Sequence, residues 1–242
     1  MKRLLKYILL FFVGLNLLII LSGKTWMYKA ISITYLKGYT SSYIHDYIHF
    51  PNNTIESGKH QEWLVSPNYN KANLPQFIRA LNDSLETTAF IVIQNDSILF
   101  EEYWYAYSAD SMSNSFSMAK SWVGALIGVA IKEGKIETVD QKVCEFLPQF
   151  CGENEKDLSI KNLLTMSSGL NWTEDYYSPI GQTAEAYYGT DLRDLVINLK
   201  VVEESGKVFK YHSSCTQLLG FILEEATGKT ISNYATEKLW KP

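Results

Sequence analysis

The segment Ser115-Phe116-Ser117-Met118-Ala119-Lys120-Ser121-Trp122 leads into an apolar run at residues 123–131, and this junction is the strongest indication of the fold. The run predicts a helix that Gly134 ends. A serine at a helix start ordinarily caps it, with Glu or Gln three residues later. Lys120 stands there instead, although its charge opposes the positive end of the helix dipole. Because residues three apart share a helix face, Lys120 can reach the Ser117 hydroxyl, which predicts a nucleophile beside an amine base.

A Ser-x-x-Lys pattern occurs by chance in many chains, so a second polar element is needed before it indicates catalysis. Tyr211 and Ser213 supply one, just before a predicted helix that begins near Ser214 and ends at Gly228. In an extended turn, residues two apart point the same way, so both side chains can face one cavity while His212 faces away. A phenol beside a lysine and a serine can relay a proton, which makes Tyr211 a catalytic candidate.

Turn residues and hydrophobic periodicity predict the remaining elements. A helix is expected at residues 74–85, followed by a β-hairpin whose strands, residues 89–94 and 98–105, flank a turn at Asn95-Asp96-Ser97. The polar, aromatic segment at residues 169–179 is interpreted as a loop. Further helices are expected at residues 160–166, 192–200, 214–226 and 231–239.

The composition is that of a globular protein. Hydrophobic residues make up 46% of the 242-residue chain and charged residues 20%, which excludes a disordered protein. The net charge of -4 and the lack of a basic stripe argue against nucleic acid as a partner. His45 and His49 have a spacing that suits zinc, but no third ligand accompanies them, so we expect no metal site. Three cysteines are too few for a disulfide scaffold; Cys144 and Cys151 lie close enough in sequence to pair, and Cys215 is expected in the core.

Residues 1–28 are interpreted as a membrane segment outside the soluble fold. Basic residues precede an apolar stretch at residues 8–21, and a Lys, a Trp and a Tyr at residues 24–28 mark the far interface. A cleaved signal peptide and an uncleaved signal anchor both fit, and the missing small-x-small pattern favours the anchor. Either way the rest of the chain is expected on the extracytoplasmic side, periplasmic or at the cell surface. Residues 29–70 then form a membrane-proximal connector, and residues 71–242 the main domain.

Over roughly residues 71–242 the chain resembles the serine β-lactamase and penicillin-binding-protein superfamily, in particular its class C, esterase and 6-aminohexanoate-dimer hydrolase branch. The resemblance rests on Phe116-Ser117-Met118-Ala119-Lys120-Ser121, on Leu163-Leu164-Thr165-Met166-Ser167-Ser168-Gly169-Leu170, and on Tyr211-His212-Ser213. The first and third segments match the Ser-x-x-Lys and Tyr-x-Asn motifs, with Ser213 in place of Asn as in the aminohexanoate branch. It implies an α+β fold, an α/β sandwich in which helices flank an antiparallel sheet.

The resemblance also implies roles for the residues of these motifs. Ser117 would be the acylated nucleophile, and Lys120 the amine that helps to deprotonate it. Tyr211 would pass a proton to the leaving group, and the Ser117 backbone N–H would be one oxyanion donor. Ser213 would orient Lys120 or bind the substrate amide. No cofactor is implied.

Two pairs of residues in the expected loop border the same pocket. Tyr176 and Tyr177 would close over substrate, as loop tyrosines do in the aminohexanoate branch, and packing within the loop is an equal alternative. Glu174 and Asp175 are interpreted as solvated acids, since acidic loop residues usually are. The expected binding residues are therefore Ser213, Tyr176 and Tyr177.

The family's third motif, Lys or His followed by Thr or Ser and then Gly, has no match after Tyr211. Lys229-Thr230-Ile231 lacks the glycine and joins two predicted helices. We therefore expect the C-terminal strands of the sheet to be missing and the 242-residue chain alone to be nearly inactive, because one oxyanion donor is worth about 3 to 4 kcal/mol. Two functions stay open: an exported serine hydrolase that forms an acyl-enzyme with an amide, ester or lactam, and a non-catalytic, membrane-anchored remnant or binding module for peptidoglycan or a partner chain.

Overall fold

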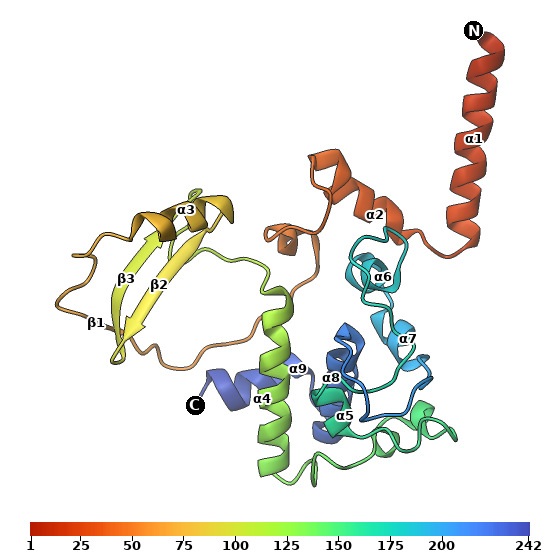
Figure 1. Cartoon of the computed structure of the whole chain (residues 1–242). Coiled ribbons are helices and arrows are strands. Elements are labelled where there is room, and N and C mark those ends of the chain that lie inside the picture. Colours follow the sequence, from red (N-terminus) through yellow and green to blue (C-terminus); the bar gives the residue numbers. More distant parts are fainter. The chain divides into compact units, whose positions relative to one another are not determined.

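The computed structural model describes residues 1–242, and its elements are drawn in Figure 1. The chain forms two compact units, one made of residues 1–56 and 114–242 and the other of residues 57–113. The first unit is helical, and the second contains the sheet. The boundaries at residues 28 and 70 separate a membrane segment, a connector and a main domain by their amino-acid composition, and not by compact units. That division stays a prediction.

The helical unit contains eight α-helices joined by short 3-10 helices and loops. One of the 3-10 helices, Phe116–Met118, leads directly into α4, and a π-helical turn, Thr236–Trp240, follows α9. The α-helices are α1 (Lys2–Leu21), α2 (Trp26–Ile33), α4 (Ala119–Lys132), α5 (Ile160–Leu164), α6 (Gln182–Tyr188), α7 (Leu192–Ile197), α8 (Ser213–Thr227) and α9 (Ile231–Ala235).

Helices α4 and α8 pack side by side and form the centre of the main core (Figure 1). Leu126 and Ile127 of α4 are 1% exposed, and Leu218 and Ile222 of α8 are fully buried. Each buried Leu or Ile of this kind contributes about 1.5–3 kcal/mol relative to an exposed one. The glycines that were predicted to end the two helices do so: Gly134 and Gly228 adopt left-handed φ angles of 68° and 67°.

The second unit contains α3 (Gln76–Ser84) and the strands β1 (Leu64–Val65), β2 (Ala89–Gln94) and β3 (Ser97–Tyr103). The predicted hairpin is confirmed: β2 and β3 are antiparallel, and Asn95 and Asp96 between them have φ angles of 50° and 54°. Two successive left-handed residues are typical of the tight turn that matches the twist of a hairpin. Strand β3 ends two residues earlier than predicted, because Tyr105 has a φ of 56°.

The sheet is mixed, with strand order β1-β3-β2. Strand β1 adds a short parallel pairing to β3, in which Leu64 lies opposite Ser97, so β3 is central and β2 has one edge without a partner strand. An ion pair of 3.0 Å between Arg79 and Glu102 joins α3 to β3. The hairpin and one helix of this unit were therefore predictable, and the two-residue strand β1 was not.

Helices α2 and α6 were not predicted from the sequence. They pack on each other: Trp26, Ala30 and Ile33 of α2 form a second, smaller core with Tyr188 of α6. Trp26, which was expected at a membrane interface, is only 8% exposed. The expected position of Trp26 at a membrane interface is therefore wrong. Trp26, Ala30 and Ile33 are spaced so that they share one face of α2, and the folded unit buries this face.

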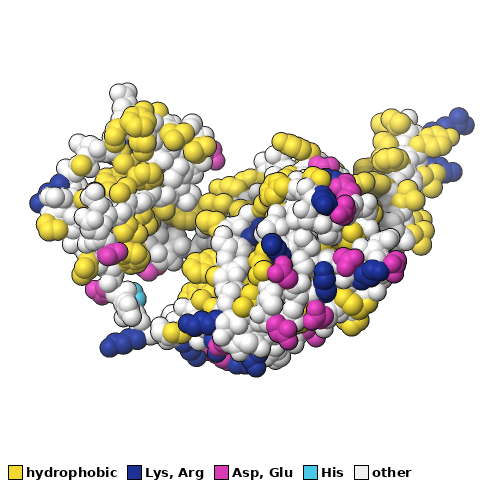
Figure 2. All heavy atoms as spheres, turned by 60° about the horizontal axis from the view of Figure 1, so that its bottom comes forward, with side chains coloured by type: hydrophobic (Ala, Val, Ile, Leu, Met, Phe, Trp, Pro, Cys, Tyr) yellow, Lys and Arg dark blue, Asp and Glu magenta, His cyan; other side chains and the backbone are white.

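Helix α1 is long and apolar enough to cross a membrane, with a mean hydropathy of 2.5 and no buried residue. Figure 2 shows its hydrophobic side chains at the surface and basic side chains near its N-terminal end. An N-terminal signal sequence has the same length and composition, so α1 fits both alternatives raised by the sequence.

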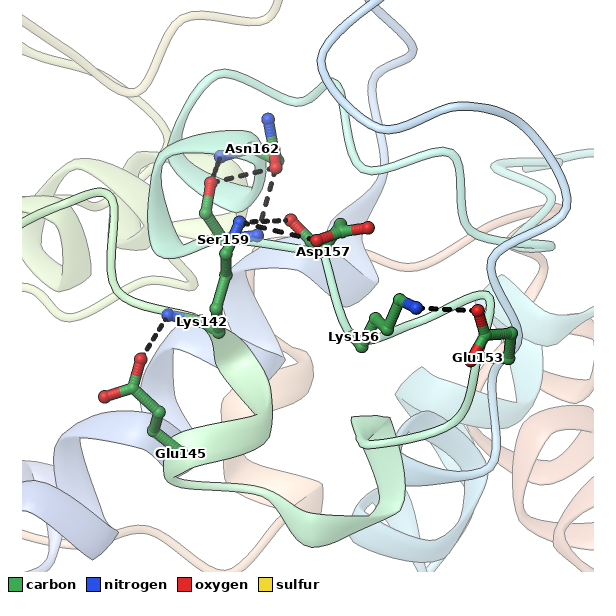
Figure 3. A network of polar contacts seen from close by, with 7 residues as sticks. All are labelled: Lys142, Glu145, Glu153, Lys156, Asp157, Ser159 and Asn162. Atoms are coloured by element: carbon green, nitrogen blue, oxygen red, sulfur yellow. Dashed lines mark hydrogen bonds and ion pairs between the residues drawn. The ribbon is translucent and has the colours of Figure 1, made fainter.

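The segment between α4 and α5 is held by local polar contacts (Figure 3). Ser159 and Asn162 cap the start of α5 reciprocally, and the Glu145 carboxylate accepts a 2.9 Å hydrogen bond from the Lys142 backbone N–H. Cys144 and Cys151 form a disulfide, which confirms the predicted pair. Cys215 is fully buried, as predicted.

The Cys144–Cys151 disulfide closes a short loop, so we expect its removal to destabilise the helical unit modestly. Replacing both cysteines with alanine should lower the free energy of unfolding in urea by about 2–3 kcal/mol, the chain-entropy value for a loop of this length. Alkylation in denaturant without reductant should modify Cys215 alone. Modification of all three thiols would contradict the pairing.

Candidate active site

The two ends of the Ser-x-x-Lys motif meet at the start of α4. Ser117 lies in the 3-10 helix Phe116–Met118, and Lys120 is the second residue of α4. The Lys120 Nζ donates a hydrogen bond of 3.1 Å to Ser117 Oγ. Helical spacing therefore brings the amine to the hydroxyl, in the geometry that activation of a serine requires.

Tyr211 approaches the same pair from the segment before α8. The Lys120 Nζ lies 5.2 Å from the centroid of the Tyr211 ring, and Tyr211 is 39% exposed. The contact is thus a cation–π contact with the ring face, while the phenolic oxygen is left for a substrate or water. His212 has extended backbone and is 5% exposed, so it faces away from the site, as the alternation of side chains predicted.

Ser213 is hydrogen-bonded to Glu174, a contact that was not predicted from the sequence. Its hydroxyl and its backbone N–H donate hydrogen bonds of 2.6 and 2.7 Å to the Glu174 carboxylate. The same carboxylate accepts bonds of 2.6 Å from Trp172 Nε1 and from the Tyr176 hydroxyl. Glu174 therefore ties the loop at residues 171–181 to the first residue of α8.

The interpretation of Glu174 as a solvated acid is therefore wrong. A period of two was the signal that the sequence offered: Trp172, Glu174 and Tyr176 alternate along the loop, so their side chains can share one side of an extended segment. Tyr177, the residue after Tyr176, breaks this alternation and is 98% exposed. Of the two tyrosines expected at the pocket, the structure connects Tyr176 to the motif residues and leaves Tyr177 in solvent.

The hydrogen bonds determine how these groups ionise. Burial by itself would raise the pKa of the Glu174 carboxyl, but the bonds from Ser213, Tyr176 and Trp172 together hold that pKa below its ordinary value. Burial and the bond to Glu174 raise the pKa of Tyr176 to about 12. At neutral pH the loop therefore presents a carboxylate that is fully occupied by donors and a neutral phenol.

One of the two histidines considered for zinc, His49, has another partner. The Nζ of Lys37 lies 2.8 Å from His49 Nε2. Across residues 1–242, no group of three or more His, Cys, Asp or Glu side chains has a metal-binding arrangement.

The beta-lactamase family model matches residues 74–242, well over half of the chain. The 6-aminohexanoate-dimer hydrolase of Paenarthrobacter ureafaciens is 28% identical over 178 residues, which cover 69% of this chain and 45% of that protein. The chain belongs to the beta-lactamase family. This confirms the predicted superfamily.

Two solved structures share the fold. A Bacillus anthracis protein named for 6-aminohexanoate-dimer hydrolase has a TM-score of 0.71 at 20% identity, over 83% of this chain and 58% of that one. FmtA of Staphylococcus aureus has a TM-score of 0.52 at 21% identity, over 76% of this chain and 51% of that one. These likenesses confirm the predicted α+β fold class. The chain spans about half the length of these relatives.

The lowered pKa of Glu174 leads to a prediction about acid stability. A group whose pKa is lowered by folding stabilises the protein above its unfolded pKa, and this contribution is lost as the pH falls through the folded value. Glu174→Gln should therefore lower the free energy of unfolding at about pH 7 by about 1–3 kcal/mol, since the negative charge is lost and the donors to one of the two oxygens meet an NH₂ group instead of an acceptor. The difference from the wild-type protein should shrink at about pH 3.

Urea unfolding at the two pH values measures this difference. Glu153→Gln is the matched control, because Glu153 is exposed and pairs only with Lys156 on the surface. It should change the free energy of unfolding little at either pH. A loss for Glu174→Gln that is equal at both pH values would contradict the assignment of the shift to the ionised carboxylate.

Proposed function

We propose that the protein is an exported serine hydrolase that forms an acyl-enzyme at Ser117 with an amide, ester or lactam. The observation that carries this proposal is the 3.1 Å contact between Lys120 Nζ and Ser117 Oγ at the start of α4. The approach of Tyr211 to Lys120 from a second element supports it. Membership of the beta-lactamase family supports the same chemistry.

The proposed reaction begins when the Ser117 hydroxyl gives its proton to Lys120, whose side chain can accept a proton only in the amine form. The Ser117 oxygen then attacks the carbonyl carbon, and the carbonyl π electrons move to oxygen, where the Ser117 backbone N–H stabilises the charge. Collapse breaks the bond to the leaving amine or alkoxide, which receives a proton through Tyr211. Water that is deprotonated by the same groups releases the acyl product and restores Ser117.

The relatives and the loop suggest a substrate class. A hydrolase of 6-aminohexanoate dimers is among the relatives, and Ser213 in the Tyr-x-Ser segment favours an esterase or amidase over a dedicated β-lactamase. We propose that Tyr176, held by Glu174, contacts the substrate as a neutral donor and that Ser213 lies beside the substrate amide. Contact between Tyr177 and the substrate stays a prediction. It requires the Tyr177 side chain, which is exposed, to move toward the site.

The proposed location is the extracytoplasmic face of a membrane, with α1 as an uncleaved anchor. Helix α1 supports this proposal through its 20 residues, its mean hydropathy of 2.5 and the absence of any buried side chain. Basic residues on its N-terminal side favour an orientation in which the helical unit is exported.

Acylation of Ser117 is the direct test. We expect a fluorophosphonate or an activated p-nitrophenyl ester to add one adduct to Ser117, visible by intact mass and peptide mapping, and we expect Ser117→Ala to abolish it. Lys120→Ala should slow acylation by about 10²–10⁴-fold because the base is lost. Ser121→Ala, four residues further along, is the matched control and should leave the rate unchanged.

Intact mass detects a single slow acylation and so does not depend on turnover. If no adduct forms at Ser117 in the wild-type protein, the non-catalytic alternative, a binding module for peptidoglycan or a partner chain, becomes the better account.

Deletion of the N-terminal segment tests membrane attachment. Deleting residues 1–21 should move the protein from the carbonate-resistant membrane fraction to the soluble fraction, because the apolar surface of α1 is removed from the chain. The mass of the N-terminal peptide of the undeleted protein separates an anchor from a cleaved signal. A native protein that begins after residue 21 would contradict the anchor.

A further inference from the structure

The chain just before the nucleophile is tied to a segment far upstream. Asn114 lies three residues before Ser117, and its backbone N–H donates a 2.8 Å hydrogen bond to the Ile44 carbonyl. Its side-chain amide donates bonds of 3.1 Å to the Tyr43 carbonyl and 2.9 Å to the Tyr187 hydroxyl. Both hydrogens of one amide group are thus used to join three separate parts of the helical unit.

Tyr187 of α6 is the second fixed point of this arrangement. Its hydroxyl lies 3.5 Å from an Asp46 oxygen, and that oxygen also accepts a 2.8 Å bond from the Tyr43 backbone N–H. Asp46 is only 3% exposed, so these contacts are formed away from bulk water. Burial and the Asp46 carboxylate raise the pKa of Tyr187, so its phenol stays neutral.

The ring of Tyr187 supports the residue next to Ser117. Phe116 stacks on it, with ring centroids 6.3 Å apart and an interplanar angle of 24°. Phe116 has a left-handed φ of 44°, which is uncommon for an aromatic residue and persists only where neighbouring contacts hold it. Phe50 also contacts the Tyr187 ring, edge to face, with ring centroids 5.1 Å apart.

We propose that residues 43–50 act as a clamp that positions Ser117, with Asn114, Asp46 and Tyr187 as positioning residues. The clamp fixes the backbone on the N-terminal side of Ser117, while α4 fixes it on the C-terminal side. Small displacements of a nucleophile from its reactive geometry reduce rates by about 10²-fold, so holding Phe116 in its unusual conformation supports catalysis. The inference rests on the proposed function of Ser117.

The clamp lies outside the part of the chain that the family model matches, residues 74–242. Residues 43–50 precede that region, and α2, upstream of them in the chain, is packed on α6 through Trp26 and Tyr188. The segment expected to be a passive connector is therefore a structural component of the site. This gives the N-terminal part of the chain a role besides attachment.

The test uses Tyr187→Phe, which removes the hydroxyl but keeps the ring under Phe116, and Asn114→Ala, which removes both side-chain bonds. We expect each to slow fluorophosphonate acylation of Ser117 about 10–100-fold at saturating probe, with little change in the probe concentration that gives half the maximal rate. Tyr188→Phe and Asn198→Ala are matched controls: neither the hydroxyl nor the amide is bonded to Asn114 or to residues 43–50, and the Asn198 amide bonds only Asp194 in its own helix. Their rates should match the wild-type rate.

Hydrogen exchange of residues 113–120 without probe gives a readout that does not depend on a reactive serine. Tyr187→Phe and Asn114→Ala should both exchange faster there than the controls do, at equal exchange elsewhere in α4 and α8. Unchanged exchange, or unchanged acylation in an acylated wild-type protein, would overturn the clamp. If the wild-type protein is not acylated but exchange rises as expected, the proposed hydrolase function fails and the mechanical link stands. Tyr187→Phe keeps the test valid if Asn114→Ala does not fold.

Discussion

The packing of α4 against α8 is the interaction on which the rest of the site depends. Each helix has a catalytic candidate at or just before its start, Lys120 in α4 and Tyr211 before α8. The buried side chains between the helices fix their relative position to the precision of a close-packed core. Neither Lys120 nor Tyr211 is itself buried. The 5.2 Å distance between Lys120 Nζ and the centroid of the Tyr211 ring therefore follows from the packing of α4 against α8.

A second constraint is that the charged carboxylate of Glu174 needs hydrogen-bond donors. Glu174 accepts four hydrogen bonds, from a loop indole, a loop phenol and both donors of Ser213. A partly buried carboxylate is tolerated only when donors replace its water, so the loop and the start of α8 have to meet in this way. The carboxylate thus orders the two groups that we propose to contact substrate, although it does not touch the serine.

An upstream segment is also hydrogen-bonded to the chain just before the proposed nucleophile. Residues 43–50 reach the chain before Ser117 through one asparagine and one tyrosine, and α2 anchors the segment on α6. The contacts are mostly hydrogen bonds between buried or half-buried groups, whose loss leaves donors unpaired and is therefore costly. This explains how a segment with little sequence periodicity is nonetheless ordered.

The sequence by itself determined the local features: the hairpin with its Asn95-Asp96 turn, the glycine ends of α4 and α8, the Cys144–Cys151 pair and the reach of Lys120 to Ser117. All of these depend on residues close together in the chain, where helix periodicity, turn conformation and loop length leave few alternatives. Tertiary structure alone decided the burial of Trp26, the role of Glu174 and the link from Asn114 to Tyr43 and Tyr187. These contacts join residues tens of positions apart, and only the packing of the folded unit selects which polar groups meet there.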